Sequence, residues 1–239
     1  MIATKQSAGL ILTTILLTAS VRAVDAPTPT PVGPIKILEY FDNDSLPAGP
    51  RPDGAIFTFV DSADPSVSVL SRYGSKVIED VGAMLVNETT KELATKETRQ
   101  VVSELHLKGM ELPKQVIGRP KVTAVKRTSL MLRDPRNAPD GADMAALKRI
   151  RAQLIAGDAP DKIIVQKIEM PGKPLEWRVY RPIAASKSCL ACHGDPAKFS
   201  PGVKEALDHL YPEDKAVDYS AQDWRGVIRV TLEPQPETK

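Results

Sequence analysis

The sequence predicts an α+β domain with an antiparallel sheet and flanking helices. Apolar residues recur at three- and four-residue steps from Val67 to about Lys108, which indicates a long N-terminal helix. Segments of β-type content then alternate with shorter helical stretches, and Pro171-Gly172 joins two of them as a tight turn. Helices first, followed by strands interleaved with helices and a hairpin, are typical of an α+β fold and fit a small all-helical protein poorly.

The length of 239 residues allows one domain or two small ones. Hydrophobic residues make up 42% of the chain, which is enough for a core, although aromatic residues make up only 5%. The 21 prolines indicate much irregular structure.

Residues 1–23 have the pattern of a secretory signal peptide. Lys5 gives a positive start, the apolar run Ser7–Ala19 is too short to span a bilayer comfortably, and Val21-Arg22-Ala23 places small residues where a signal peptidase cuts. We expect cleavage after Ala23, a periplasmic location, and membrane contact only through this signal; an uncleaved anchor is the alternative. The remaining chain holds 30 basic and 30 acidic residues, and this balance argues against a nucleic-acid partner.

Residues 24–66 are rich in Pro, Gly and Asp and are expected to form a linker or N-terminal extension, with strand-like content in Ile35–Phe41 and Ala55–Val60. The domain itself is expected over residues 67–239. Between Val67 and Lys108 we expect one long helix or two collinear helices.

The remaining elements are predicted from local signals. Asp140 or Asp143 can cap a helix, and alternating apolar residues mark the strands. The expected elements are strand content within Lys121–Arg133, a helix to about Ile155, strands at Lys162–Met170 and Leu175–Ile183, a helix at Val203–Leu210 and a strand at Trp224–Leu232.

The second strand of the hairpin leads into Cys189-Leu190-Ala191-Cys192-His193, two cysteines separated by two residues and followed by histidine. This is the attachment pattern of c-type haem, in which each thiol adds to one vinyl group and the adjacent imidazole ligates the iron. The chain has no other cysteine, so we expect one covalent haem c.

Three other interpretations of this motif are a disulfide, a thioredoxin-like redox pair and half of a zinc site. A zinc site would need two more ligands, and only His106 and His209 remain among the histidines. A thioredoxin-like pair would precede a long helix, whereas Gly194-Asp195-Pro196 is typical of a turn.

Further stretches accompany the motif in a fixed order. They are Ile117-Gly118-Arg119, Arg127-Thr128-Ser129-Leu130, Arg136-Asn137-Ala138-Pro139-Asp140, Tyr180-Arg181-Pro182-Ile183, the extension of the haem motif through Gly194-Asp195-Pro196, Tyr211-Pro212-Glu213-Asp214-Lys215-Ala216 and Asp223-Trp224-Arg225-Gly226. In this combination, about Val101 to Leu232 resembles the Tll0287-like haem domain family. The resemblance implies a PAS-like fold and an exported or membrane-tethered haem c protein, with redox or ligand sensing rather than turnover.

The resemblance also implies a cysteine as second axial ligand, on the helix before the Gly-Arg stretch. This chain has no third cysteine, and the matching region, Val102–Lys108, offers His106 instead, which would give a bis-histidine iron. The other candidates are His209, Met110, Met131 or an open sixth position.

The two haem propionates need cations or hydrogen-bond donors, because guanidinium groups pair with carboxylates in bidentate fashion. The candidates are Arg119, Arg127, Arg133 and Arg225, with Tyr211 and Tyr219 as contacts at the haem edge. Surface arginine is the alternative interpretation for each.

We therefore expect an exported mono-haem protein that acts in redox or small-gas sensing or in electron exchange. Two nitrogen ligands leave the iron no free site, which favours this role over that of an enzyme. The sequence contains no recognisable kinase or transmitter segment, so a redox partner or signalling partner is expected. The alternatives are a dedicated periplasmic electron carrier and a peroxidase-type haem enzyme, which requires an open or labile sixth position.

Overall fold

The computed structural model describes residues 46–107 and 112–234. The predicted signal peptide, the strand predicted at Ile35–Phe41 and Met110 lie outside these ranges. Within them, no helix combines the length and the apolar character needed to cross a lipid bilayer.

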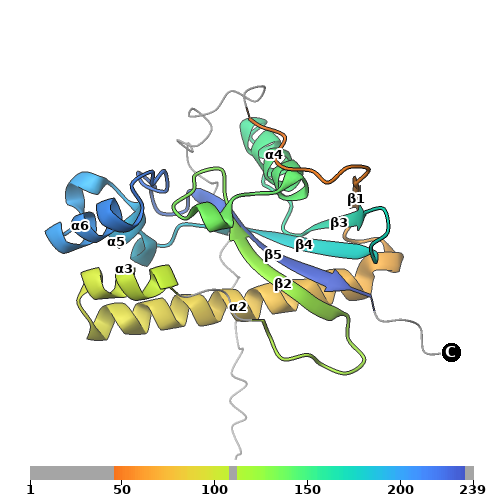
Figure 1. Ribbon diagram of the computed structural model, residues 1–239, viewed down its shortest axis with the longest axis horizontal. Helices are drawn as coiled ribbons and strands as arrows, with labels where there is room; N and C mark the ends of the chain where they lie inside the picture. Colours follow the sequence, from red (N-terminus) through yellow and green to blue (C-terminus); the bar gives the residue numbers. More distant parts are fainter. Residues whose placement is uncertain (1–45, 108–111, 235–239) are drawn as a thin grey trace, which may run out of the picture. The chain divides into compact units, whose positions relative to one another are not determined.

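Five strands form one antiparallel sheet in the order β1-β3-β4-β5-β2 (Figure 1). The predicted α+β class is confirmed, as is the hairpin of β3 and β4. The strands are β1 (Ile56–Val60), β2 (Lys121–Thr128), β3 (Ile164–Glu169), β4 (Glu176–Ala184) and β5 (Trp224–Glu233).

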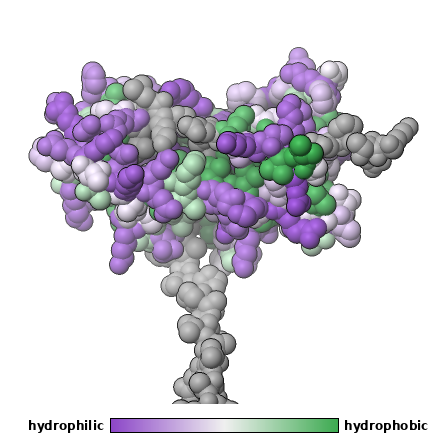
Figure 2. Space-filling view, turned by 90° about the horizontal axis from the view of Figure 1, so that it is seen from below, coloured by the Kyte–Doolittle hydropathy of each residue, from purple (hydrophilic) through white to green (hydrophobic). Residues whose placement is uncertain are grey.

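The two faces of the sheet are covered by different helices, α2 (Ser68–Thr95) and α4 (Gly141–Ile155), which lie on opposite sides in Figure 1. Successive residues of a strand point to opposite faces. On β4, Val179 packs in the cluster with α2, and Tyr180 packs in the cluster with α4. The alternation of the strands thus gives a core on each face of the sheet. Seen from below, the outer surface is mainly hydrophilic, with a smaller hydrophobic area (Figure 2).

The expectation of one long helix or two collinear helices is wrong. The backbone of Lys96 is extended, with φ −128° and ψ 158°, and the next helix, α3 (Thr98–Leu107), turns back beside α2 (Figure 1). Lys96 Nζ also lies 2.6 Å from the carboxylate of Glu104 on α3, which ties the turn to the returning helix. The reversal brings Val102 into a cluster with α6 (Pro201–Leu210).

The N-terminal limit of the domain also lies earlier than the predicted residue 67. β1 pairs with β3 along its whole length, from Ile56 opposite Glu169 to Val60 opposite Val165. Leu46 is buried in the same cluster as α4. Part of the segment expected to be a linker therefore belongs to the sheet, and the strand content expected within Ala55–Val60 is confirmed as the edge strand β1.

A buried charged cluster connects the start of α4 to the sheet. Asp140 caps α4 and forms a capping box with Asp143, whose side chain is fully buried. Asp143 accepts hydrogen bonds from Arg229 at 3.0 Å and from Arg178 at 3.2 Å. The stretch Arg136–Asp140 therefore has a structural role. The carboxylates of Asp140 and Asp143 neutralise arginines that the sheet directs into the core.

Candidate functional site

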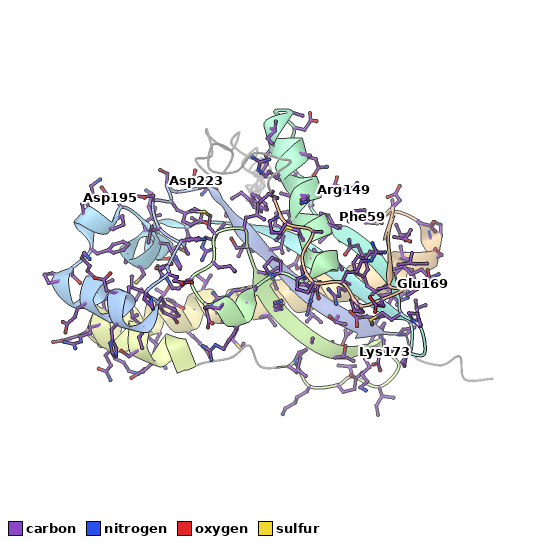
Figure 3. All side chains as sticks on the ribbon, turned by 45° about the horizontal axis from the view of Figure 1, so that its top comes forward. Phe59, Arg149, Glu169, Lys173, Asp195 and Asp223 are labelled. Atoms are coloured by element: carbon purple, nitrogen blue, oxygen red, sulfur yellow. The ribbon has the colours of Figure 1, made fainter. Side chains whose placement is uncertain are left out.

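The Cys-Leu-Ala-Cys-His motif begins in a single 3₁₀ turn after β4 and continues into the short helix α5 (Leu190–His193). The backbones of Ala185 and Asp223 hydrogen-bond at 2.8 Å, which ties the entry of the motif to the start of β5. Figure 3 shows Asp195 and Asp223 near this end of the sheet, whereas Glu169 and Lys173, at the β3–β4 turn, lie at the opposite end.

The two thiols are not joined in a disulfide and contact different clusters. Cys189 packs against the α4 cluster, and its Sγ lies 3.1 Å from the hydroxyl of Ser186. Cys192 packs against the cluster of α3 and α6, and burial raises its pKa. The two sulfurs are therefore separate from each other and lie on one turn of chain.

The imidazole of His193 is fixed by a backbone carbonyl. Its Nδ1 lies 2.7 Å from the oxygen of Ala216, and because a carbonyl only accepts, Nδ1 carries the hydrogen. Burial and the nearby cations of Arg225 and Arg133 lower the pKa of His193 well below its ordinary value. The ring is thus neutral, and Nε2, which has no hydrogen-bond partner among the described residues, is the nitrogen available to a metal.

Arginines from three segments surround this imidazole. Arg127 comes from the end of β2, where its side chain is exposed and its guanidinium makes no hydrogen bond or ion pair with the described residues. Arg225, from β5, donates to the carbonyl of Met131 at 3.2 Å and lies 5.0 Å from the ring centre of Tyr219. The sheet therefore directs at least one uncommitted guanidinium toward the motif.

Arg133 has a different environment, because its donors are occupied. Its Nε donates to Asp214 at 2.8 Å, and its Nη2 contacts the carbonyl oxygens of Cys192 and Ala216. The guanidinium also lies 5.9 Å from the ring centre of Tyr211, which is buried. Arg133 and Tyr211 are thus brought to the site, with Arg133 bound to protein groups.

Other predicted candidates are not brought to the motif. Arg119 is exposed and lies just before β2 begins, where Lys121 pairs with Glu233. Arg127 lies at the other end of the same strand. His209 lies on the exposed side of α6, and Met131 is buried in the α4 cluster. His106 belongs to α3, but its side chain lies outside the described part of the structure.

Two site residues escaped the prediction, Asp214 and Ala216. Both lie within the stretch Tyr211–Ala216 that the resemblance had included, so that stretch was the available signal. Ala216 acts through its backbone oxygen, and no side-chain pattern marks such a role. Tyr219, which was predicted as an edge contact, lies edge-on to His193 with ring centres 6.5 Å apart, and its buried hydroxyl has no hydrogen-bond partner among the described residues.

An open recess of about 600 Å³ borders the motif on one side. Its lining includes Leu190, Gly194, Asp195 and Tyr219. In residues 46–107 and 112–234, no group of three or more His, Cys, Asp and Glu side chains is placed to share a metal ion.

Over residues 52–233 the sequence matches the Tll0287-like family. The chain belongs to this family. The match spans all five strands of the sheet as well as the motif. The predicted family assignment is thus confirmed.

One solved structure to which the chain is similar is the crystal structure of the cyanobacterial heme-protein Tll0287. The two chains are 24% identical, with a TM-score of 0.35, and the similarity covers 48% of this chain and 63% of that chain. The chain thus spans slightly less than two thirds of that protein. No curated protein matches the sequence.

Proposed function

We propose that this chain carries one covalent haem c, attached through Cys189 and Cys192, with His193 as an axial ligand. Each S–H would add across one vinyl C=C bond, forming one C–S and one C–H bond with no leaving group and no oxidant. The observation that carries the proposal is the geometry of His193, whose Nδ1 is held by the carbonyl of Ala216 at 2.7 Å while Nε2 has no partner among the described residues. Two unlinked thiols on the same turn of chain supply the attachment points.

The cations near the motif fit a group with two carboxylates. Arg127 has no partner among the described residues, and Arg225 makes a single 3.2 Å bond to a carbonyl. Arg127 is exposed and Arg225 is half-buried, so both guanidinium groups are open to an incoming carboxylate, with which they would form charge-assisted hydrogen bonds. We therefore assign Arg127 and Arg225 to the haem carboxylates and withdraw Arg119, which lies at the other end of β2.

We propose His106 as the second axial ligand. Position 106 follows Val102 by four residues on α3, so the two positions share one face of the helix. Val102 packs in the cluster that Cys192 contacts, and that face of α3 therefore turns toward the motif. His209 is less suited, because it lies on the exposed side of α6.

A haem held in this way supplies a one-electron iron couple. The chain's own residues would keep the neutral imidazole in position and exclude water from it through the clusters on either side of α5. This arrangement suits redox sensing or electron exchange with a partner protein in the periplasm. Signal-peptide cleavage after Ala23 would deliver the chain to the compartment in which c-type haem is assembled.

The test is co-expression of the full chain with the haem c maturation machinery. The purified protein should be coloured, should gain the mass of one haem, and should give the pyridine haemochrome spectrum of two thioether bonds. Cys189→Ala together with Cys192→Ala should abolish the mass gain, whereas Ser186→Ala, which removes a neighbour of Cys189 Sγ, should retain it. Colourless wild-type protein with both thiols open to alkylation would overturn the proposal.

A further inference from the structure

The loop after α6 wraps around His193 through its backbone. The N–H of Asp218 donates to the carbonyl of Gly194 at 2.8 Å, and the N–H of Tyr219 donates to the carbonyl of His193 at 3.0 Å. Ala216, whose oxygen accepts from Nδ1, is fully buried. The position of one carbonyl group therefore decides how the imidazole is held.

A nearly buried ion pair holds that residue by both of its backbone groups. Asp214 accepts the N–H of Ala216 at 2.8 Å through Oδ1 and the Nε of Arg133 at 2.8 Å through Oδ2. Arg133 in turn places Nη2 3.3 Å from the oxygen of Ala216, and the same atom contacts the carbonyl of Cys192. The exposed fractions of the Arg133 and Asp214 side chains are only 12% and 10%, so water screens the pair weakly.

The carbonyl of Ala216 thus serves two donors, an imidazole N–H and a guanidinium. A hydrogen bond at the second nitrogen of a ligating imidazole raises its basicity toward the metal. A cation that shares the acceptor takes part of its electron density and so weakens the bond from Nδ1. Arg133 would therefore limit the electron donation of His193 to iron.

We propose that Asp214 and Arg133 are positioning residues with separate roles: Asp214 holds the backbone of Ala216 and places the guanidinium of Arg133, and Arg133 limits the strength of the Ala216 carbonyl as an acceptor for His193. This inference rests on the proposed haem attachment at Cys189 and Cys192. It predicts that the pair raises the reduction potential of the iron, since a weaker donor ligand disfavours the oxidised state. It also reassigns Arg133, which the sequence had suggested as a propionate partner.

The deciding variant is Arg133→Lys, which keeps the charge and removes the planar fork. In reduced, ¹⁵N-labelled protein, the Nδ1–H proton resonance of His193 should move downfield, and the midpoint potential should fall. Arg136→Lys is the matched control, because Arg136 is exposed, pairs with Asp134 and lies in the same segment. That control should leave both quantities at the wild-type value.

A second variant, Asp214→Asn, releases the Nε of Arg133 but keeps an acceptor for the N–H of Ala216. In this variant the Nδ1–H resonance of His193 should also move downfield. The resonance is the readout here, because the loss of the negative charge of Asp214 alters the midpoint potential by itself. Unchanged resonances in both variants, with haem attached and the fold intact by circular dichroism, would overturn the inference. If Arg133→Lys lowered the midpoint potential without moving the Nδ1–H resonance of His193, Arg133 would be assigned to a propionate instead. That result would also overturn the inference.

Failure of the proposed function would be recognised separately, as wild-type protein without covalent haem. The contact itself would then be tested in that protein, where the same Nδ1–H resonance should respond to Arg133→Lys and not to Arg136→Lys.

Discussion

Gly74 on α2 lies directly against Val179 on β4. A Cβ added at position 74 would be 2.6 Å from Cγ2 of Val179, closer than carbon atoms approach without a shift of the backbone. The glycine thus lets the helix rest on the sheet. This contact fixes the distance between α2 and the strand that leads into the motif.

Gly74→Ala should therefore destabilise the fold by about 1–3 kcal/mol, the usual cost of overpacking. Gly82→Ala is the matched control on the same helix, because its Cβ would lie an ordinary 3.6 Å from Ile228. That control should stabilise the protein by about 0.5–1 kcal/mol through helix propensity. Urea denaturation of both variants measures the two effects, and equal free energies of unfolding would contradict the proposed contact.

The carboxylate of Asp143 is the buried anion shared by Arg178 and Arg229. Asp143→Ala should lower the free energy of unfolding by about 3–5 kcal/mol, because it removes a fully buried carboxylate and leaves the buried Arg229 with only the longer 3.5 Å contact to Asp140. Asp208→Ala removes a carboxylate from an exposed pair with Lys204 and should change stability by less than about 0.5 kcal/mol. A small effect at both positions would show that the buried network is dispensable.

Asp140 should make the protein sensitive to acid. Burial alone would raise the pKa of this carboxyl, but Arg178 and the N–H of Asp143 outweigh burial, and the net pKa is lowered. The unfolded chain then binds the proton more readily, so the stability that Asp140 provides is present above its unfolded pKa and is lost as the pH falls through the folded pKa.

The comparison is with Asp140→Asn, which can still cap α4 but cannot titrate. The difference in free energy of unfolding between wild type and variant should be largest near pH 7 and should shrink below about pH 4. Denaturant titrations at a series of pH values measure it. A difference that stays constant down to pH 2 would refute the assignment.

His106→Ala tests the second axial ligand in the haem-loaded protein. Loss of that ligand should convert low-spin iron to high-spin iron in the EPR spectrum and open a site for carbon monoxide in the reduced state. His209→Ala is the control, because this histidine is exposed on α6. A low-spin spectrum in the His106 variant would exclude His106, and loss of low spin in the His209 variant would reassign the ligand.

The elements with strong local signals were predictable from the sequence. The strand pair around Pro171-Gly172 and the helix capped by Asp140 depend on residues close in sequence, and the structure contains both. The reversal after Lys96 was not predictable, because the strongly polar stretch Asn87–Gln100 shows that a helix can end but not in which direction the chain continues.

The candidate site was predictable only as far as side-chain chemistry marks it. Cys189, Cys192 and His193 follow from their spacing, whereas the carbonyl of Ala216 is invisible to any pattern of side chains. Arg119 and Arg127 both seemed suitable because sequence gives charge and not distance. Arg119 lies two residues before β2 begins at Lys121, whereas Arg127 lies one residue before β2 ends at Thr128, so the two arginines belong to opposite ends of the strand.

The order of the strands has a consequence for how the chain folds. β5 is the last strand described, yet it lies between β2 and β4 and pairs with both. During synthesis or translocation, β2 emerges about a hundred residues before its partner β5. Until β5 has emerged, β2 and β4 each expose an unpaired edge. Completion of the sheet is therefore a late, all-or-none event, and a nascent chain that stalls before Trp224 would be a substrate for chaperones or aggregation.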